Sequence, residues 1–143
     1  MTLRITFVSV VFAAVMTVFG ATTIVEGLAA VGPAVLTGLT FAAVITAYTA
    51  RLKNETGLAS LFRFGIVPLF LFSGTFFPIE QLPDYIEPLA YLTPLWHGVE
   101  LCRGLALGLE YSVPPLISVA YLLVLTAAGA FLSIRTLQRR LIS

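Results

Sequence analysis

Residues 71–100 read LFSGTFFPIEQLPDYIEPLAYLTPLWHGVE, and this stretch decides how the rest of the chain is arranged. Prolines break helices because they lack a backbone donor. The stretch is therefore too interrupted for a regular membrane-spanning helix, yet it is too apolar for an ordinary loop in water. Its role depends on where it lies relative to a membrane. The interrupting residues are Pro78, Pro83, Pro88 and Pro94, together with Glu80, Asp84, Glu87 and Glu100.

The composition of the whole chain predicts a membrane protein. Hydrophobic residues make up 59% of the 143 residues and charged residues 10%, compared with about 45–50% and about 25% in soluble domains. The mean hydropathy is +1.01. A soluble domain of this size has too little interior to hide so much apolar surface. The net charge of +1 gives no basis for nucleic-acid binding, and one cysteine and one histidine are too few for a typical zinc site.

Four apolar blocks are each long enough to cross a membrane. They cover approximately residues 5–25, 28–50, 58–79 and 113–134. Each corresponds to a helix of about 30 Å at 1.5 Å per residue, the thickness of the hydrocarbon core. The sequence thus predicts an all-α, polytopic membrane protein, with one transmembrane domain over residues 1–143. The first block is longer than the apolar core of a signal peptide, which favours a retained span.

Basic residues gather on one side of this arrangement. Only Arg103 of the eight basic residues falls in the segment between the third and fourth spans. Because Lys and Arg are retained on the cytoplasmic side, we predict that both termini are cytoplasmic. The loop between the second and third spans is then cytoplasmic as well, and it contains Arg51, Lys53, Asn54 and Glu55.

The segment between the third and fourth spans is predicted to be an external helical hairpin over about residues 83–107. We expect one helix near residues 83–92, a break at Thr93–Pro94 and a second helix near residues 95–107. A broken backbone is tolerated at membrane depth only where protein or a water-filled cavity covers it. Two interpretations remain open: a re-entrant gate, or an anchor that lies on the outer leaflet. The candidate gate residues are Pro83, Tyr85, Pro94, Trp96, His97, Glu100 and Arg103, of which Tyr85 and Trp96 suit the membrane interface.

The spacing of His97, Glu100 and Arg103 places these three residues on one face of a helix. One interpretation is a polar cluster that gates or senses a substrate near the membrane surface. The other is structural, with an ion pair that holds the hairpin and a hydrogen bond from His97, because charges in membranes are usually paired.

The end of the third span combines small residues with phenylalanines. The small residues allow close helix packing, or they let a helix that borders a pathway flex beside a hydrophobic constriction. No phosphate-binding loop or nucleophile elbow is present, so we predict no catalytic residues and no cofactor or metal in this chain. The candidate pathway residues are Phe72, Ser73, Gly74, Thr75, Phe76, Phe77 and Pro78.

Three motifs carry a resemblance to a known family. They are SGTFFP at residues 73–78, QLP at residues 81–83 and LTPLWHGVELCRG at residues 92–104. With these motifs the chain resembles the ABC-2 family of bacterial exporter permeases, most closely the branch of nodulation-type lipooligosaccharide exporters and daunorubicin-type drug exporters. TGLTFAAVITAYTA at residues 37–50 and RTLQRRL at residues 135–141 are similar to flanking parts of the same family.

This resemblance implies a transport subunit of the bacterial inner (plasma) membrane that is not itself an enzyme. It would pair with a second permease subunit and with a separate ABC ATP-binding subunit, which holds ATP and Mg²⁺. The substrate would be an amphiphile, such as a lipid-linked saccharide, a glycolipid or a hydrophobic drug, which lies between the two permeases and is moved outward by alternating access. Membrane lipid would be a further partner. The third span would border the route, the hairpin would close it, and residues 51–55 would face the ATPase.

The length of the chain leaves a second function open. Permeases of this family usually have about six spans, and four fit here, so the chain resembles the C-terminal part of one. The alternative to a transport subunit is a truncated, non-transporting fragment or interaction module that assembles with intact permeases.

Overall fold

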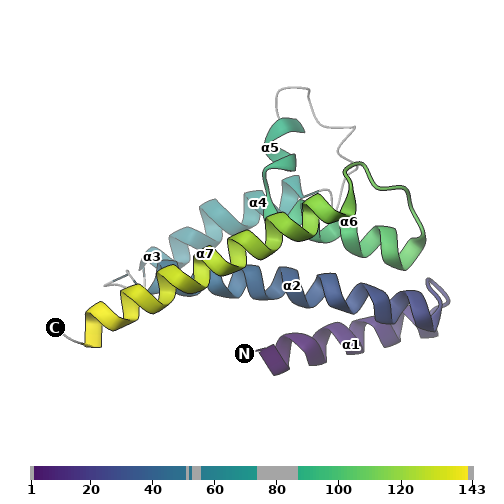
Figure 1. Cartoon of the computed structure of the whole chain (residues 1–143), viewed down its shortest axis with the longest axis horizontal. Coiled ribbons are helices and arrows are strands. Elements are labelled where there is room, and N and C mark those ends of the chain that lie inside the picture. Colours follow the sequence, from purple (N-terminus) through teal and green to yellow (C-terminus); the bar gives the residue numbers. More distant parts are fainter. Residues whose placement is uncertain (1, 51, 53–55, 74–86, 142–143) are drawn as a thin grey trace.

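The computed structural model describes residues 2–50, 52, 56–73 and 87–141, which form helices joined by turns, with no strand among them (Figure 1). The prediction of an all-α chain is confirmed. In chain order the helices are α1 (Thr2–Val18), α2 (Ile24–Thr49), α3 (Thr56–Leu61), the π-helical turn η1 (Phe62–Ile66), α4 (Val67–Phe72), α5 (Glu87–Tyr91), α6 (Pro94–Leu107) and α7 (Pro115–Leu141).

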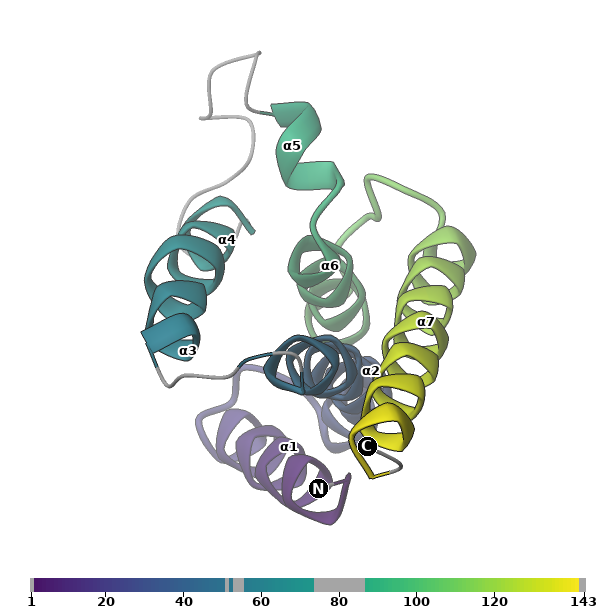
Figure 2. The ribbon, with the colours of Figure 1, turned by 90° about the vertical axis from the view of Figure 1, so that its left-hand side faces the viewer.

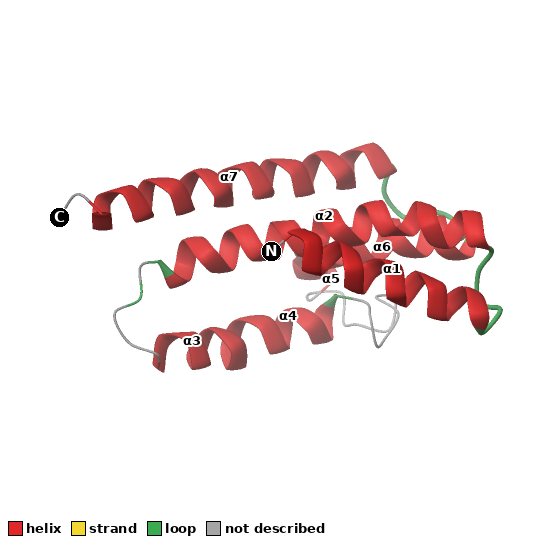
Figure 3. Cartoon of the chain, turned by 90° about the horizontal axis from the view of Figure 1, so that it is seen from below, coloured by secondary structure: helices red, strands yellow, loops and turns green. Residues whose placement is uncertain are grey.

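Helix α2 is the centre of the bundle. Figure 2 shows it between α1, α6 and α7, whereas α3 and α4 lie further out. The N-terminal half of α2 packs against α6, where Thr37 contacts Gly98. Its C-terminal half packs against α7, where Ala43 contacts Gly129, and the two helices run side by side (Figure 3). The three largest interhelical contacts, with α1, α6 and α7, are all made by α2.

The turn between α1 and α2 lies earlier than the apolar blocks predicted. Helix α1 ends at Val18 instead of residue 25, and α2 begins at Ile24 instead of residue 28. Gly20 has a φ of +70°, a conformation that favours glycine. Thr23 and Glu26 form a capping box, in which each side chain accepts a hydrogen bond from the backbone N–H of the other residue. The predicted boundary between the first two spans was therefore wrong by several residues, because a hydropathy pattern does not detect helix-capping residues.

Hydroxyl groups connect α2 to α7 inside the bundle. The Thr40 Oγ1 atom lies 2.7 Å from Thr126 Oγ1, and Thr40 is fully buried. Ser133 donates a hydrogen bond of 3.2 Å to the carbonyl of Ala43. Small polar residues of this kind let helices approach closely and bond to each other where water is absent.

Replacing Thr40 by valine removes one of these bonds without a change of shape. We expect the free energy of unfolding to fall by about 0.6 kcal/mol, and by at most about 1.7 kcal/mol, the range for single hydrogen bonds between membrane helices. Titration with denaturant in detergent micelles measures this loss. Thr46→Val is the matched control, because the Thr46 hydroxyl donates to Ala42 of its own helix. An equal loss in the control would contradict an interhelical role.

The π-helical turn widens the helix that runs from α3 into α4. The N–H of Val67 donates to the carbonyl of Phe62, five residues back. Pro68 follows directly, and a proline inside a helix has no N–H and crowds the carbonyl four residues before it. The wider turn accommodates this proline within a continuous helix.

The outer surface of the bundle is apolar. Large hydrophobic side chains are exposed on α1, α2, α4 and α7, with Phe7, Leu28 and Val124 as examples. A soluble monomer rarely exposes apolar surface on this scale. Two helical segments, Ile24–Thr49 and Pro115–Thr136, are long and apolar enough to cross a membrane.

The remaining two predicted spans are apolar but shorter in the described structure. Thr2–Val18 and Gly57–Phe72 are apolar helical segments of 10–17 residues. The predicted third span also includes residues 74–79, which lie outside the described residues. The count of four spans therefore stays a prediction.

Candidate functional site

The helix breaks between α5 and α6 at the place that the sequence predicted. Pro94 has no N–H to donate to Ala90, and the carbonyl of Ala90 instead accepts bonds from the N–H (3.0 Å) and the hydroxyl (2.8 Å) of Thr93. Thr93 then caps α6, and its Oγ1 accepts a bond of 3.3 Å from the N–H of Trp96. The break is therefore a satisfied, locally encoded turn.

Trp96 anchors α5 to α6. Its side chain is 3% exposed and packs in a small core with Ala90, Tyr91 and Val113. The rings of Tyr91 and Trp96 meet edge to face, with their centroids 4.6 Å apart. Protein thus encloses Trp96, and its position relative to the membrane interface stays a prediction.

His97 is buried against α7. Its Nδ1 atom lies 3.0 Å from Ser118 Oγ, and its ring lies between those of Trp96 and Tyr121, at centroid distances of 4.9 and 4.5 Å. At 14 residues, α6 is too short to span a membrane. His97 therefore joins α6 to α7 inside the protein.

Two bonds from α7 hold the two sides of the break together. His97 on α6 contacts Ser118, and the hydroxyl of Tyr121 donates to the carbonyl of Leu92, just before the break. Ser118 and Tyr121 lie three residues apart and thus on one face of α7. Sequence reasoning missed both, because the residues that they contact lie 21 and 29 positions away.

The side chains of Glu100 and Arg103 on α6 have different neighbours. Glu100 accepts a bond of 2.6 Å from the N–H of Ser112 and so ties α6 to the loop before α7. Arg103 lines a cavity on the other side. The hydrogen bond expected of His97 in the structural interpretation is present, whereas the role of these residues as a gate stays a prediction. Within the described ranges, no group of three or more His, Cys, Asp or Glu side chains is placed to hold a metal ion.

Many of the predicted site residues cannot be placed. Of the pathway residues, Phe72 ends α4, and Ser73 is buried with its hydroxyl donating to the carbonyl of Phe70 over 2.8 Å. The structure brings Pro94, Trp96, His97, Glu100 and Arg103 together on α6. Outside the described residues lie Gly74, Thr75, Phe76, Phe77 and Pro78, the gate residues Pro83 and Tyr85, and the loop residues Arg51, Lys53, Asn54 and Glu55.

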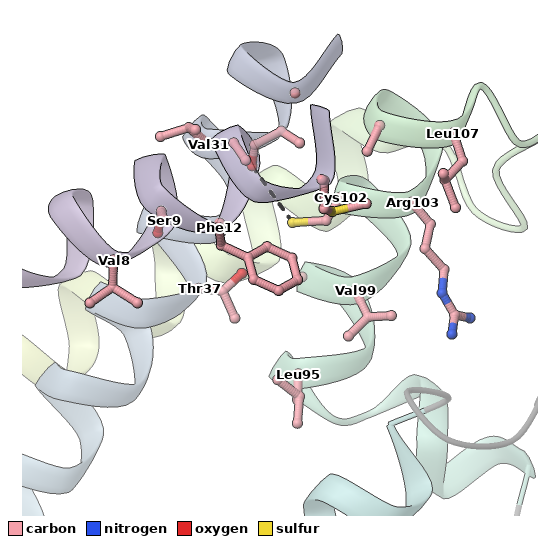
Figure 4. A pocket seen from close by; sticks show the side chains of 17 residues that line it. Val8, Ser9, Phe12, Val31, Thr37, Leu95, Val99, Cys102, Arg103 and Leu107 are labelled. Atoms are coloured by element: carbon pink, nitrogen blue, oxygen red, sulfur yellow. Dashed lines mark hydrogen bonds between the residues drawn. The ribbon is translucent and has the colours of Figure 1, made fainter. Parts of the chain in front are cut away.

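An apolar cavity of about 560 Å³ lies between α1, α2 and α6 (Figure 4). Phe12 lines it from α1, Val31 and Thr37 from α2, and Val99 and Cys102 from α6. Sequence reasoning did not predict this space. The available signal was the series of small residues along one face of α2, at Gly27, Ala30 and Ala34.

The apolar outer surface and the two helices able to cross a bilayer define a helical membrane protein. Residues 1–107 match the family described as ABC-2 type transporter. The chain therefore belongs to the ABC-2 type transporter family, which confirms the resemblance found in its motifs.

The chain is similar to Nodulation protein J of several rhizobia. It is 33% identical to the protein of Sinorhizobium fredii (strain NBRC 101917 / NGR234) over 108 residues, which are 76% of this chain and 41% of the relative. It is 33% identical to that of Neorhizobium galegae (74% and 40% covered) and 31% identical to that of Rhizobium meliloti strain 1021 (74% and 40% covered). The chain thus spans about two fifths of the length of these relatives. No solved structure matches it.

Proposed function

We propose that this chain is a membrane-spanning subunit of an ATP-driven exporter in the bacterial inner membrane. Its substrate is an amphiphile, of the class of lipid-linked saccharides, glycolipids or hydrophobic drugs. The family and the similarity to Nodulation protein J support a transport subunit. The observation that carries the proposal is the depth at which α5 and α6 are broken.

Helix α6 runs antiparallel along the first half of α2. At one end, Thr22 just before α2 donates a bond of 2.7 Å to the carbonyl of Ala106, and toward the other end Gly98 contacts Thr37. Helix α2 has 26 residues and is about 39 Å long. Thr37 lies near its middle, and the break at Thr93 is five residues of α6, about 7.5 Å, beyond Gly98. The break therefore lies alongside the interior of a helix long enough to cross the bilayer, well away from both of its ends.

This depth favours the re-entrant gate over the surface anchor. A broken backbone at membrane depth needs its polar groups satisfied and covered by protein. Thr93 satisfies the carbonyl of Ala90, Tyr121 donates to the carbonyl of Leu92, and the side chains around Trp96 exclude solvent. An anchor on the surface has no need of this cover.

In the proposed mechanism, the hairpin closes the outer end of the route and the third span borders it through residues 72–78, with Phe76 and Phe77 as the constriction. A separate ABC subunit binds and hydrolyses ATP with Mg²⁺, and it contacts the cytoplasmic loop at residues 51–55. A second permease subunit completes the route, and both termini are cytoplasmic. ATP binding closes the inner side, and the substrate leaves past the hairpin by alternating access.

The second candidate function is an interaction module that assembles with intact permeases and does not transport alone. It is the alternative that the sequence left open, and the chain spans about two fifths of the length of its relatives.

One experiment separates the two functions. The full chain is co-expressed with the ABC ATP-binding subunits and an intact ABC-2 permease of its own organism. The complex is purified and reconstituted in proteoliposomes, where ATP turnover is measured with and without a lipooligosaccharide. We expect co-purification and a severalfold rise in turnover when the amphiphile is present. Assembly without stimulation indicates the interaction module, and failure to co-purify contradicts both functions. A complex whose ATP-binding subunit lacks its phosphate-loop lysine is the control for contaminating ATPase.

A further inference from the structure

We propose that the cavity between α1, α2 and α6 binds one acyl chain of an anionic membrane phospholipid, whose phosphate lies at Arg103. This lipid is a resident component of the subunit and not its cargo. The proposal rests on the cavity alone and holds whether or not the chain transports an amphiphile.

Apart from Arg103, the described residues that line the cavity offer hydrocarbon and no polar group that needs water. Its three short polar side chains already donate to backbone carbonyls: Ser9 to Ile5 over 2.9 Å, Thr37 to Pro33 over 2.7 Å and Cys102 to Ala30 over 3.7 Å. Cavities lined in this way exclude water and accept apolar ligands. In a bilayer, the apolar ligand at hand is a lipid tail.

The size and shape of the cavity suit a single chain. Its lining extends along α6 from Leu95 to Leu107, about 18 Å at 1.5 Å per residue. The cavity has a volume of about 560 Å³. If each methylene group takes about 30 Å³, as a water molecule does in the liquid, the cavity holds roughly 18 methylene groups. A helix is about 10 Å across, so 18 Å of helix occupies roughly 1,400 Å³. The cavity is therefore too small to enclose a helix from a partner protein.

The two sides of the cavity differ in a way that orients an amphiphile. Gly27 and Ala106 are buried at its base, whereas Phe12 is 64% exposed and Leu107 is 48% exposed at its rim. The rim therefore opens toward the surrounding lipid, and a chain can enter sideways from the bilayer.

Arg103 supplies the charge that selects the headgroup. It is the one charged residue among the described residues of the lining, and Figure 4 shows its guanidinium on the far side of Val99 from Phe12 and Thr37. Arginine binds phosphate through a planar pair of N–H donors. Arg103 already has an interaction within the protein, and its five donors allow it to bind a phosphate in addition. Because lipid tails fill the cavity equally well whatever their headgroup, selectivity for an anionic lipid depends on this residue.

Photocrosslinking tests the proposal directly. The full 143-residue chain is placed in phosphatidylcholine nanodiscs that contain a trace of phosphatidylglycerol with a diazirine near the end of one acyl chain. After irradiation, the labelled residues are mapped by mass spectrometry. We expect labelling concentrated on Phe12, Val99 and their neighbours, several times stronger than on the outward residues Phe7 and Leu116.

Matched variants identify the site. Ala34→Phe fills the cavity and is expected to reduce labelling of Val99 severalfold, whereas Ala29→Phe adds the same side chain on an exposed face of α2 and leaves labelling unchanged. If circular dichroism shows that Ala34→Phe is not folded, Val99→Phe is used instead, because it fills the same cavity from α6. Arg103→Gln is expected to equalise labelling by phosphatidylglycerol and phosphatidylcholine probes.

Three results would overturn the proposal. The first is labelling spread evenly over outward and cavity residues. The second is the same labelling of Val99 in Ala34→Phe and Ala29→Phe, provided that both variants are folded. The third is loss of the label when the chain is assembled with its ATP-binding subunit and a second permease, which would show that protein covers this groove. Equal labelling by the two headgroups in the unmodified chain would overturn the role of Arg103.

Discussion

Replacement of Trp96 by alanine is expected to lower the free energy of unfolding of the bundle by roughly 3–5 kcal/mol, the usual loss for a large aromatic side chain removed from a core. Trp96 is 3% exposed and is the largest side chain in the cluster that joins α5 to α6. Its removal leaves a cavity beside Tyr91 and also removes one of the two rings that flank His97.

Denaturant titration in detergent micelles, followed by circular dichroism, measures this effect. Leu107→Ala is the matched control, because Leu107 lies at the end of the same helix and is 48% exposed. Trp96→Phe retains an aromatic ring and is expected to recover part of the loss. A loss below about 1 kcal/mol for Trp96→Ala would contradict the position of Trp96 in a packed core.

The second large effect is expected for Gly129→Val on α7. A Cβ atom at this position would lie 3.0 Å from the carbonyl carbon of Ala43 and 3.0 Å from the backbone nitrogen of Val44. Because these are backbone atoms of α2, they cannot move aside as a flexible side chain can. The two helices must separate, which stretches the bond between Thr40 and Thr126. We expect a loss of about 1–3 kcal/mol from overpacking alone.

Thermal unfolding in micelles measures this second effect. Ala130→Val adds two methyl groups at the next position of α7, which is exposed, and is expected to change the midpoint little. Gly129→Ala should fall between the unmodified chain and Gly129→Val, since it adds one carbon at the contact. A Gly129→Val variant as stable as Ala130→Val would contradict the close approach of α2 and α7.

Local chemistry was sufficient to predict part of the site. The break at Thr93–Pro94 follows from the missing N–H of proline and from the ability of threonine to cap the next helix, and both are properties of adjacent residues. The turn before α2 also depends on neighbouring residues, Thr23 and Glu26, but the hydropathy pattern alone did not predict it. Spacing placed His97, Glu100 and Arg103 on one face, but it did not reveal their different surroundings.

The sequence by itself determined that this chain is helical, is apolar enough for a membrane and breaks its helix at Thr93, because composition and neighbouring residues control these features. Only the tertiary structure decided that Ser118 and Tyr121 hold that break and that a cavity lies between α1, α2 and α6. The physical reason is that the residues of an apolar helix have similar helix propensity and hydrophobicity on every face, so the sequence does not indicate which face packs against another helix. Which face meets another helix depends on the fit of small and large side chains from distant segments, such as Gly129 against Ala43.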